Sequence, residues 1–272
     1  GDNMNATLEM NQLSPQFLRL GSLLTRRIDD PAVVAQGFTS PYPGFVNQFG
    51  NSATLAQALR PFPHFRDIPN HYGAIGQNWY DALQTKVEKR FGSSVFMFSY
   101  VWSKTQSLGS RSQTAFNENP QNSYDFESEK ALQLYDWPHV VNFLGSFELP
   151  FGRGKRFFSD SRIADAVLGG WVIGTTIQYR LVGNVLLLQA PNTLRNSLFN
   201  NFKRANTTGL PIRTSLGRRD LDPSDPNSRW LNPAAFAQPG QFEFGSASRY
   251  LSDMRNPPVL TENLSLVKRT NL

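Results

Sequence analysis

The sequence has no cysteine and only three histidines among its 272 residues. The missing cysteine excludes disulfide bonds, thiolate metal sites and a cysteine nucleophile, although it does not identify a cellular compartment. No histidine stands in a His-Glu-x-x-His or comparable ligand spacing, and no Gly-x-Ser-x-Gly motif occurs. We therefore do not expect an enzyme, and we assign no catalytic residue, cofactor-binding residue or metal ligand.

Long apolar runs are also absent. No stretch of about 18 apolar residues occurs, which excludes a transmembrane helix, but barrel strands need only about 10 residues of alternating pattern. The net charge is +6, yet the basic residues are scattered and form no basic helix, so we expect no nucleic-acid partner. The chain begins at Gly rather than Met, and we expect it to be part of a longer precursor.

What the sequence does contain is alternation with a period of two, most clearly in a hairpin over residues 79–104. Side chains on a strand alternate between its two faces. Around the turn at Gly92-Ser93, the first arm alternates apolar with charged residues, and the second arm carries a row of four aromatics on one face: Phe96, Phe98, Tyr100 and Trp102. A soluble sheet covers such a face with a second layer, whereas an outer-membrane strand turns it toward lipid.

The spacing of the remaining alternating stretches favours a barrel. Short and long connections follow one another along the chain, as in outer-membrane barrels with short periplasmic turns and long outer loops. We predict an all-β fold, an incomplete antiparallel transmembrane β-barrel with about five long strands. Its parts are an extracellular loop (1–78), the hairpin (79–104), a second extracellular loop (105–136), two strands with a periplasmic turn (137–189), a third extracellular loop (190–257) and a last strand (258–272). The strand that begins near residue 169 is expected to continue to about residue 188.

Aromatic residues lie at both predicted ends of these strands, as the two girdles of a bilayer-spanning barrel require. Lys89 is in phase with the apolar set, and its aliphatic stem is expected to reach the inner interface. We predict that the following residues face lipid: Phe96, Phe98, Tyr100, Trp102, Val141, Phe143, Trp171, Ile173, Ile177 and Tyr179.

Several runs of the sequence resemble one family. Residues 83–91 and 99–104 are similar to TonB-dependent outer-membrane receptors of the Oar-like, acidobacterial type. Further runs that carry the likeness are residues 148–157, 168–171, 225–236 and 264–269, so it covers nearly the whole chain. The resemblance implies the C-terminal portion of a barrel of about 22 strands with an internal plug. That barrel would carry a nutrient across the outer membrane of a Gram-negative cell with TonB-coupled energy. The family's plug, TonB-contacting segment and aromatic-terminated last strand are not in this sequence.

The resemblance also implies partners, namely outer-membrane lipid and lipopolysaccharide, a TonB complex contacted through regions outside this sequence, and a small nutrient ligand. Basic and aromatic residues of loop 190–257 are the candidates to contact that ligand, with a solvated surface as the alternative: Arg213, Arg218, Arg219, Arg229 and Trp230. Oxygen ligands for calcium also crowd residues 220–227, although Asp-Pro turns explain them more simply.

Two other classes of protein remain open at this point. A soluble or surface-attached β-sandwich, acting as an adhesin or binding module, has the same alternation and covers its aromatic face with a second protein layer. A glycosidase needs two opposed carboxylates in a cleft. Glu88 and Glu148 both face the predicted lumen, but no spacing in the sequence places them at a useful separation.

Overall fold

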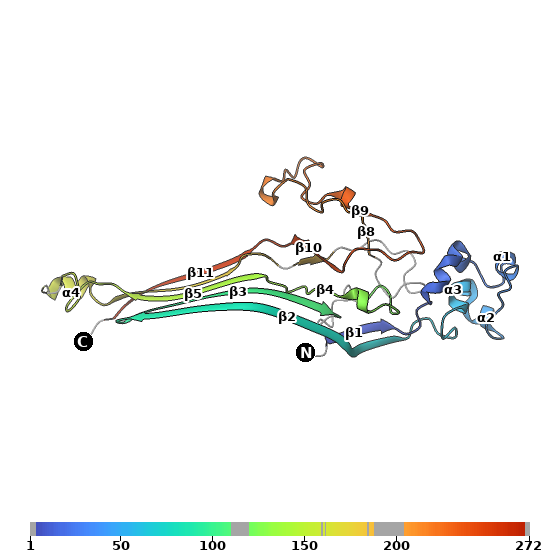
Figure 1. Ribbon diagram of the computed structural model, residues 1–272, viewed down its shortest axis with the longest axis horizontal. Coiled ribbons are helices and arrows are strands. Elements are labelled where there is room, and N and C mark those ends of the chain that lie inside the picture. The colour runs from blue at the N-terminus through green and yellow to red at the C-terminus, as the bar shows by residue number, and fades with distance from the viewer. Residues whose placement is uncertain are drawn as a thin grey trace. The chain divides into compact units, whose positions relative to one another are not determined.

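The computed structural model describes residues 4–109, 120–158, 160, 162–183, 185–187 and 204–269 (Figure 1). No described helix is long and apolar enough to cross a membrane. The chain divides into two compact units. The first, which we call the loop unit, comprises Gly1–Trp79, Gln106–Leu134 and Val185–Met254. The second, the strand unit, comprises Tyr80–Thr105, Tyr135–Asn184 and Arg255–Leu272.

The strand unit is one antiparallel sheet. Its strands are hydrogen-bonded in the order β2, β3, β5, β6, β11, with the bounds Pro69–Phe91, Ser94–Leu108, His139–Glu148, Trp171–Arg180 and Val259–Lys268. Gly92 has a φ of 57°, a left-handed conformation that glycine adopts without strain, and this permits the tight turn between β2 and β3. Helix α4 (Arg162–Leu168) lies in the connection between β5 and β6, and β11 ends the described sheet as an open edge.

The loop unit is built from short elements around a core of its own. Strand β1 (Met4–Glu9) pairs with the beginning of β2, as at Leu8 and Asn70. The other elements are the 3-10 helices η1 (Pro15–Thr25), η2 (Gly50–Ser52), η4 (Glu127–Glu129), η5 (Arg218–Asp220) and η6 (Pro233–Ala235), the helices α1 (Pro31–Val34), α2 (Phe45–Phe49) and α3 (Leu55–Ala58), and the strands β4 (Ala131–Leu132), β7 (Val185–Leu187), β8 (Asn206–Thr207), β9 (Phe236–Ala237) and β10 (Tyr250–Arg255).

The core of the loop unit comes from a short part of the chain. Between residues 13 and 56, nine apolar side chains are buried together: Leu13, Leu24, Ile28, Val33, Phe45, Phe49, Ala53, Leu55 and Ala56. Phe242 and Phe244 pack against this cluster from a distant segment. In the strand unit, Val172 is the one apolar residue that is buried to the same degree among those the structure describes.

The predicted boundaries need three corrections. Strand β2 begins at Pro69 rather than 79, because β1 supplies a partner for residues that carry no alternation of their own. Residues 1–78, predicted as one extracellular loop, also hold strand β1 and a packed core in addition to short helices. The strand from residue 171 does not continue to 188. It ends at Arg180, and β7 is a separate strand that pairs with β10.

Candidate functional site

The register of the strand unit brings the residues predicted to face lipid onto one face of the sheet. Residues directly opposite each other in an antiparallel ladder point to the same side. Phe98 pairs with Phe143, and Phe143 pairs in turn with Ile177. The rest of the predicted set follows in phase. One face, which we call the aromatic face, therefore carries Phe96, Phe98, Tyr100, Trp102, Val141, Phe143, Trp171, Ile173, Ile177 and Tyr179.

No second protein layer covers the aromatic face within the part of the chain that the structure describes. Trp102 keeps 56% of its surface exposed, and Leu264, which β11 adds to the same face, keeps 79%. Leaving a large apolar side chain in water rather than burying it costs about 1.5–3 kcal/mol. A row of such side chains therefore requires an apolar environment. The sandwich alternative, which needs a covering sheet, does not fit these strands.

Two charged residues of β11 share the aromatic face, and the structure shows what each contacts. Glu262 lies opposite Ile177 and accepts a hydrogen bond from the Tyr179 hydroxyl. Lys268 lies opposite Trp171 at the end of the strand, and its Nζ donates to the carbonyl oxygen of Val167 at 2.9 Å. A carboxylate within an apolar face is unfavourable unless it is hydrogen-bonded, and Tyr179 supplies that bond.

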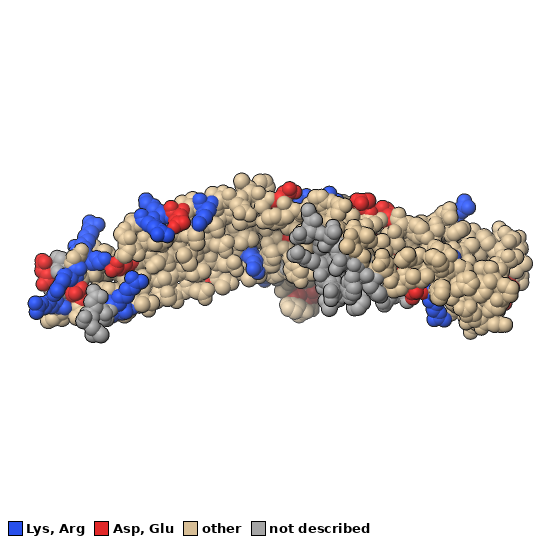
Figure 2. All heavy atoms as spheres, turned by 90° about the horizontal axis from the view of Figure 1, so that it is seen from below, with Lys and Arg blue, Asp and Glu red and all other residues tan. Residues whose placement is uncertain are grey.

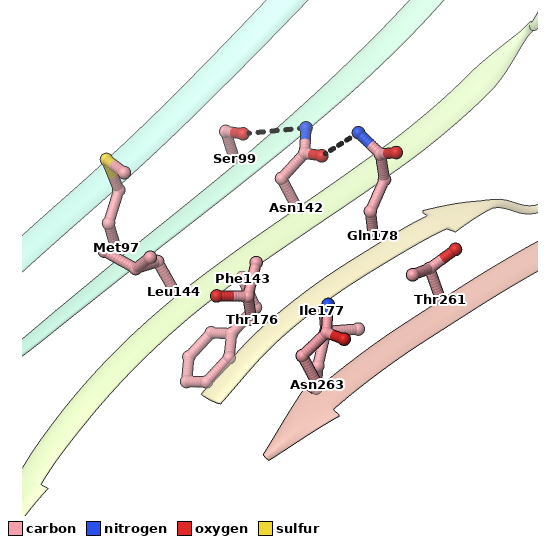
Figure 3. A pocket seen from close by; sticks show the side chains of 10 residues that line it. All are labelled: Met97, Ser99, Asn142, Phe143, Leu144, Thr176, Ile177, Gln178, Thr261 and Asn263. Carbon is pink, nitrogen blue, oxygen red and sulfur yellow. Dashed lines mark hydrogen bonds between the residues drawn. The ribbon is translucent and has the colours of Figure 1, made fainter. Parts of the chain in front are cut away.

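The opposite face, which we call the polar face, carries a row of hydrogen-bonded side chains across three strands. Asn142 Nδ2 donates to Ser99 Oγ at 3.4 Å, and Gln178 Nε2 donates to Asn142 Oδ1 at 3.1 Å (Figure 3). The row lies in a hollow of about 330 Å³ that is also lined by Met97, Leu144, Thr176, Thr261 and Asn263, and by Phe143 and Ile177 of the aromatic face. Uncharged donors and acceptors of this kind are suited to a water-filled lumen.

The carboxylates of the polar face are occupied by basic side chains. Glu148 lies 2.9 Å from Lys155 Nζ. Glu88 lies 3.5 Å from Lys86 and 3.2 Å from Arg90. Both acids considered for glycoside hydrolysis therefore take part in ion pairs with neighbouring basic side chains.

The predicted ligand-contacting residues lie on one loop of the loop unit, residues 213–231, whose two ends are bridged and which we call the excursion. Its neck is a bridge between Arg213 and Leu231, with the Thr214 N–H donating to the Trp230 carbonyl at 3.0 Å. Arg218 and Arg219 lie on η5 within this excursion. Arg213, Arg219 and Arg229 are all exposed, and the Nε of Arg229 donates to the carbonyl of Pro226 at 2.7 Å. The side chain of Arg218 lies outside the described residues.

The acidic residues considered for calcium are used in turns. Asp222 Oδ1 accepts hydrogen bonds from the Ser224 amide at 2.9 Å and the Ser224 hydroxyl at 2.7 Å, and Asp225 Oδ1 accepts one from the Asn227 amide at 2.8 Å. The bonds from Ser224 hold the pKa of Asp222 below its ordinary value. The described residues contain no group of three or more His, Cys, Asp and Glu that could hold a metal ion. The turn interpretation therefore accounts for these oxygens.

The sequence reasoning missed a loop of residues 61–66 whose backbone is held from inside the loop unit. Asn11, which is fully buried, donates from Nδ2 to the carbonyls of Phe62 at 2.9 Å and Phe65 at 2.8 Å. Gln57 donates from Nε2 to the carbonyls of Pro63 at 2.9 Å and Phe65 at 2.7 Å. Inward-facing carbonyls with buried partners fix the conformation of this loop.

The same loop turns its aromatic side chains outward. Phe62 is 46% exposed and Phe65 is 58% exposed. The His64 ring stacks on Tyr42 with centroids 4.1 Å apart and an interplanar angle of 10°. A rigid loop that keeps large aromatic groups in solvent is typical of a binding surface. The sequence carries one indication of this loop, the run Pro61-Phe-Pro-His-Phe65, in which the prolines disfavour a helix or a strand.

Comparison with known proteins identifies the family of the chain. The whole chain, residues 1–272, matches the family described as outer membrane beta barrel domain. Comparison with curated proteins and with solved structures finds no match. The family match confirms two predictions made from the sequence, an antiparallel outer-membrane β-barrel fold and a location in the outer membrane.

Proposed function

Because the chain belongs to the outer membrane beta barrel domain family, we propose that it forms part of an active transporter. This transporter captures a nutrient ligand at the cell surface and admits it to the periplasm with TonB-coupled energy. Support for the TonB-dependent class comes from the family-like runs at residues 83–91, 99–104 and 225–236. In this proposal the chain works by binding and conduction and carries out no catalysis.

The observation that carries the proposal is the two-faced sheet of the strand unit. One face gathers aromatic and aliphatic side chains that need hydrocarbon, and the other joins Ser99, Asn142 and Gln178 by hydrogen bonds. A sheet with these two faces can separate lipid from a wet interior. Such an interior gives a polar nutrient a path across the membrane.

The loop unit supplies the surfaces that would capture the ligand. The first is the excursion that carries Arg213, Arg218, Arg219, Arg229 and Trp230, suited to an anionic group. The second is the aromatic loop of residues 61–66, suited to the apolar face of a ligand. Outer-membrane lipid and lipopolysaccharide would surround the barrel. The TonB complex would bind regions of the receptor outside this sequence.

Uptake by cells that express the full-length receptor tests the proposal. Accumulation of a labelled siderophore, an oligosaccharide and a peptide is compared in cells with and without TonB. We expect one of the three to accumulate at least tenfold more in cells that contain TonB. Entry of all three at TonB-independent rates would identify a passive pore instead. Accumulation of none of them with TonB present would contradict these ligand classes.

A further inference from the structure

In the connection between β5 and β6, described residues before α4 are fastened to the helix itself. Asp165 of α4 accepts a hydrogen bond from the Arg153 amide at 2.7 Å, which fastens the turn that precedes the helix. Gly152 has a φ of 101°, and a Cβ at this position would collide with the Asp165 carboxylate. The turn therefore needs glycine here, and it holds its neighbouring side chains in place.

The carboxyl end of α4 is tied to the aromatic face of the sheet. Trp171 Nε1 and Lys268 Nζ each donate to the Val167 carbonyl oxygen at 2.9 Å. Trp171 and Lys268 are paired residues of β6 and β11 on the aromatic face. The helix thus ends on the side of the sheet that faces hydrocarbon.

Large apolar side chains of this connection point into solvent. Ile163 is 80% exposed and Val167 is 59% exposed, and their spacing of four places them on one side of α4. Phe157 and Phe158 are exposed as well, and the rings of both lie near Phe151, with centroids 6.0 and 6.2 Å away. The end of α4 that carries Val167 lies at the Trp171 end of the aromatic face.

Basic residues surround the apolar surface. Residues 150–170 contain four Lys and Arg against two Asp, and Figure 2 shows basic side chains gathered at the end of the sheet that carries α4. Lys155 is paired with Glu148. Arg153, Arg156 and Arg162 are exposed, and none forms an ion pair with a carboxylate of the described chain. The Arg156 guanidinium lies over the Phe157 ring, 5.4 Å from its centroid. Exposed apolar groups bordered by guanidinium groups that have no carboxylate partner are the pattern of an interfacial membrane anchor.

We propose that the connection from residue 150 to 170 is an anchor that binds the phosphate groups of anionic phospholipids. It lies at the same strand ends as the two-residue turn at Gly92, because Val95 pairs with Ser146 next to both connections. Short connections of outer-membrane barrels lie on the periplasmic side, where the leaflet consists of phospholipid. Arginine binds phosphate through paired hydrogen bonds as well as charge. The inference rests on the outer-membrane location and does not depend on what the protein transports.

The experiment measures lipid binding to the full-length protein purified in detergent. Native mass spectrometry gives the affinity for phosphatidylglycerol, phosphatidylethanolamine and lipopolysaccharide. We expect the wild-type protein to prefer phosphatidylglycerol to phosphatidylethanolamine by at least tenfold. The triple variant Arg153→Gln, Arg156→Gln, Arg162→Gln should lose roughly fivefold for each charge and on the order of a hundredfold in all.

Two matched variants keep the result decisive. Arg213→Gln, Arg219→Gln, Arg229→Gln removes the same charge from the loop unit and should leave phosphatidylglycerol binding unchanged. Arg153→Lys, Arg156→Lys, Arg162→Lys keeps the charge, tests folding, and should retain most of the binding. An equal loss in the loop-unit variant, or a wild-type protein without preference for phosphatidylglycerol, overturns the proposal. A preference for lipopolysaccharide that disappears in the first variant also overturns it, because the connection would then face the outer leaflet.

Discussion

The loop unit and the strand unit use apolar residues in opposite ways. The loop unit buries Leu24, Phe45 and Leu55 completely in a core. The strand unit leaves Trp102 and Leu264 largely exposed. A chain can keep both arrangements only if the two units meet different surroundings, water for the first and hydrocarbon for the second. The comparison shows that membrane embedding can be read from where apolar side chains remain unburied.

Each unit has both buried and exposed ion pairs, and one pair from each unit shows how their surroundings differ. In the loop unit, Arg204 and Glu129 form an ion pair whose side chains are 8% and 1% exposed. The backbone N–H of Gln121 also donates to Glu129 Oε1, at 3.1 Å. In the strand unit, Arg90 and Glu88 form a pair whose side chains are 75% and 39% exposed. The buried pair belongs to a packed interior, and the exposed pair lies where water screens it.

The largest effect is expected from breaking the buried pair. Arg204→Met leaves Glu129 buried without its partner, which should destabilise the loop unit by about 3–5 kcal/mol. Arg90→Met, the matched change in the strand unit, should cost less than about 1 kcal/mol. Amide hydrogen exchange of residues 120–134 in the full-length protein measures the first effect, and exchange of β2 measures the second. Equal losses of protection in both variants would remove the distinction between the units.

The second largest effect concerns the two faces of β3. Phe98→Arg places a charge on the aromatic face and should lower the free energy of unfolding, measured in lipid vesicles, by about 2–4 kcal/mol. Ser99→Arg, one residue further along and on the polar face, should lower it by less than about 1 kcal/mol because the lumen is wet. Urea titration of the full-length protein in vesicles gives both values. Similar costs at both positions would show that lipid does not cover the aromatic face.

The third effect belongs to the aromatic loop of the loop unit. Asn11→Ala removes the buried amide that bonds the Phe62 amide and the carbonyls of Phe62, Phe65 and Arg66. The loop should lose about 1–3 kcal/mol of local stability because buried backbone groups are left unpaired. Hydrogen exchange of residues 62–66 should then be faster, and ligand uptake slower. Unchanged protection in the variant would mean that the loop is not held by this side chain.

The architecture of the strand unit could be predicted from the sequence more completely than that of the loop unit. A strand with two different environments repeats every two residues, so the faces of β3, β5 and β6 could be assigned from local pattern. The loop unit gives no such period, because helices of four or five residues are too short to show one.

The candidate site was predictable in part for the same reason. The arginines of η5 and its neighbours could be named from composition, and the aromatic face from alternation. The hydrogen bonds from Asn11 to residues 62–66 could not be predicted, since these partners lie more than 50 residues from Asn11 in the sequence. Glu262 was missed because its contact with Tyr179 depends on the register between β6 and β11.

The smallest effect is expected for Gln178 on the polar face, and Gln121 is the matched glutamine of the loop unit. Gln178 is exposed and bonds Asn142 only through Nε2, so Gln178→Ala should change stability by less than about 0.5 kcal/mol. Gln121 is buried and bonds both the Gly245 carbonyl and the Arg204 amide, so Gln121→Ala should cost about 1–3 kcal/mol. Urea titration and hydrogen exchange of the full-length variants measure these changes. A large cost at Gln178 would mean that the polar face is packed against protein rather than open to water, since only a dry surrounding makes one amide hydrogen bond that valuable.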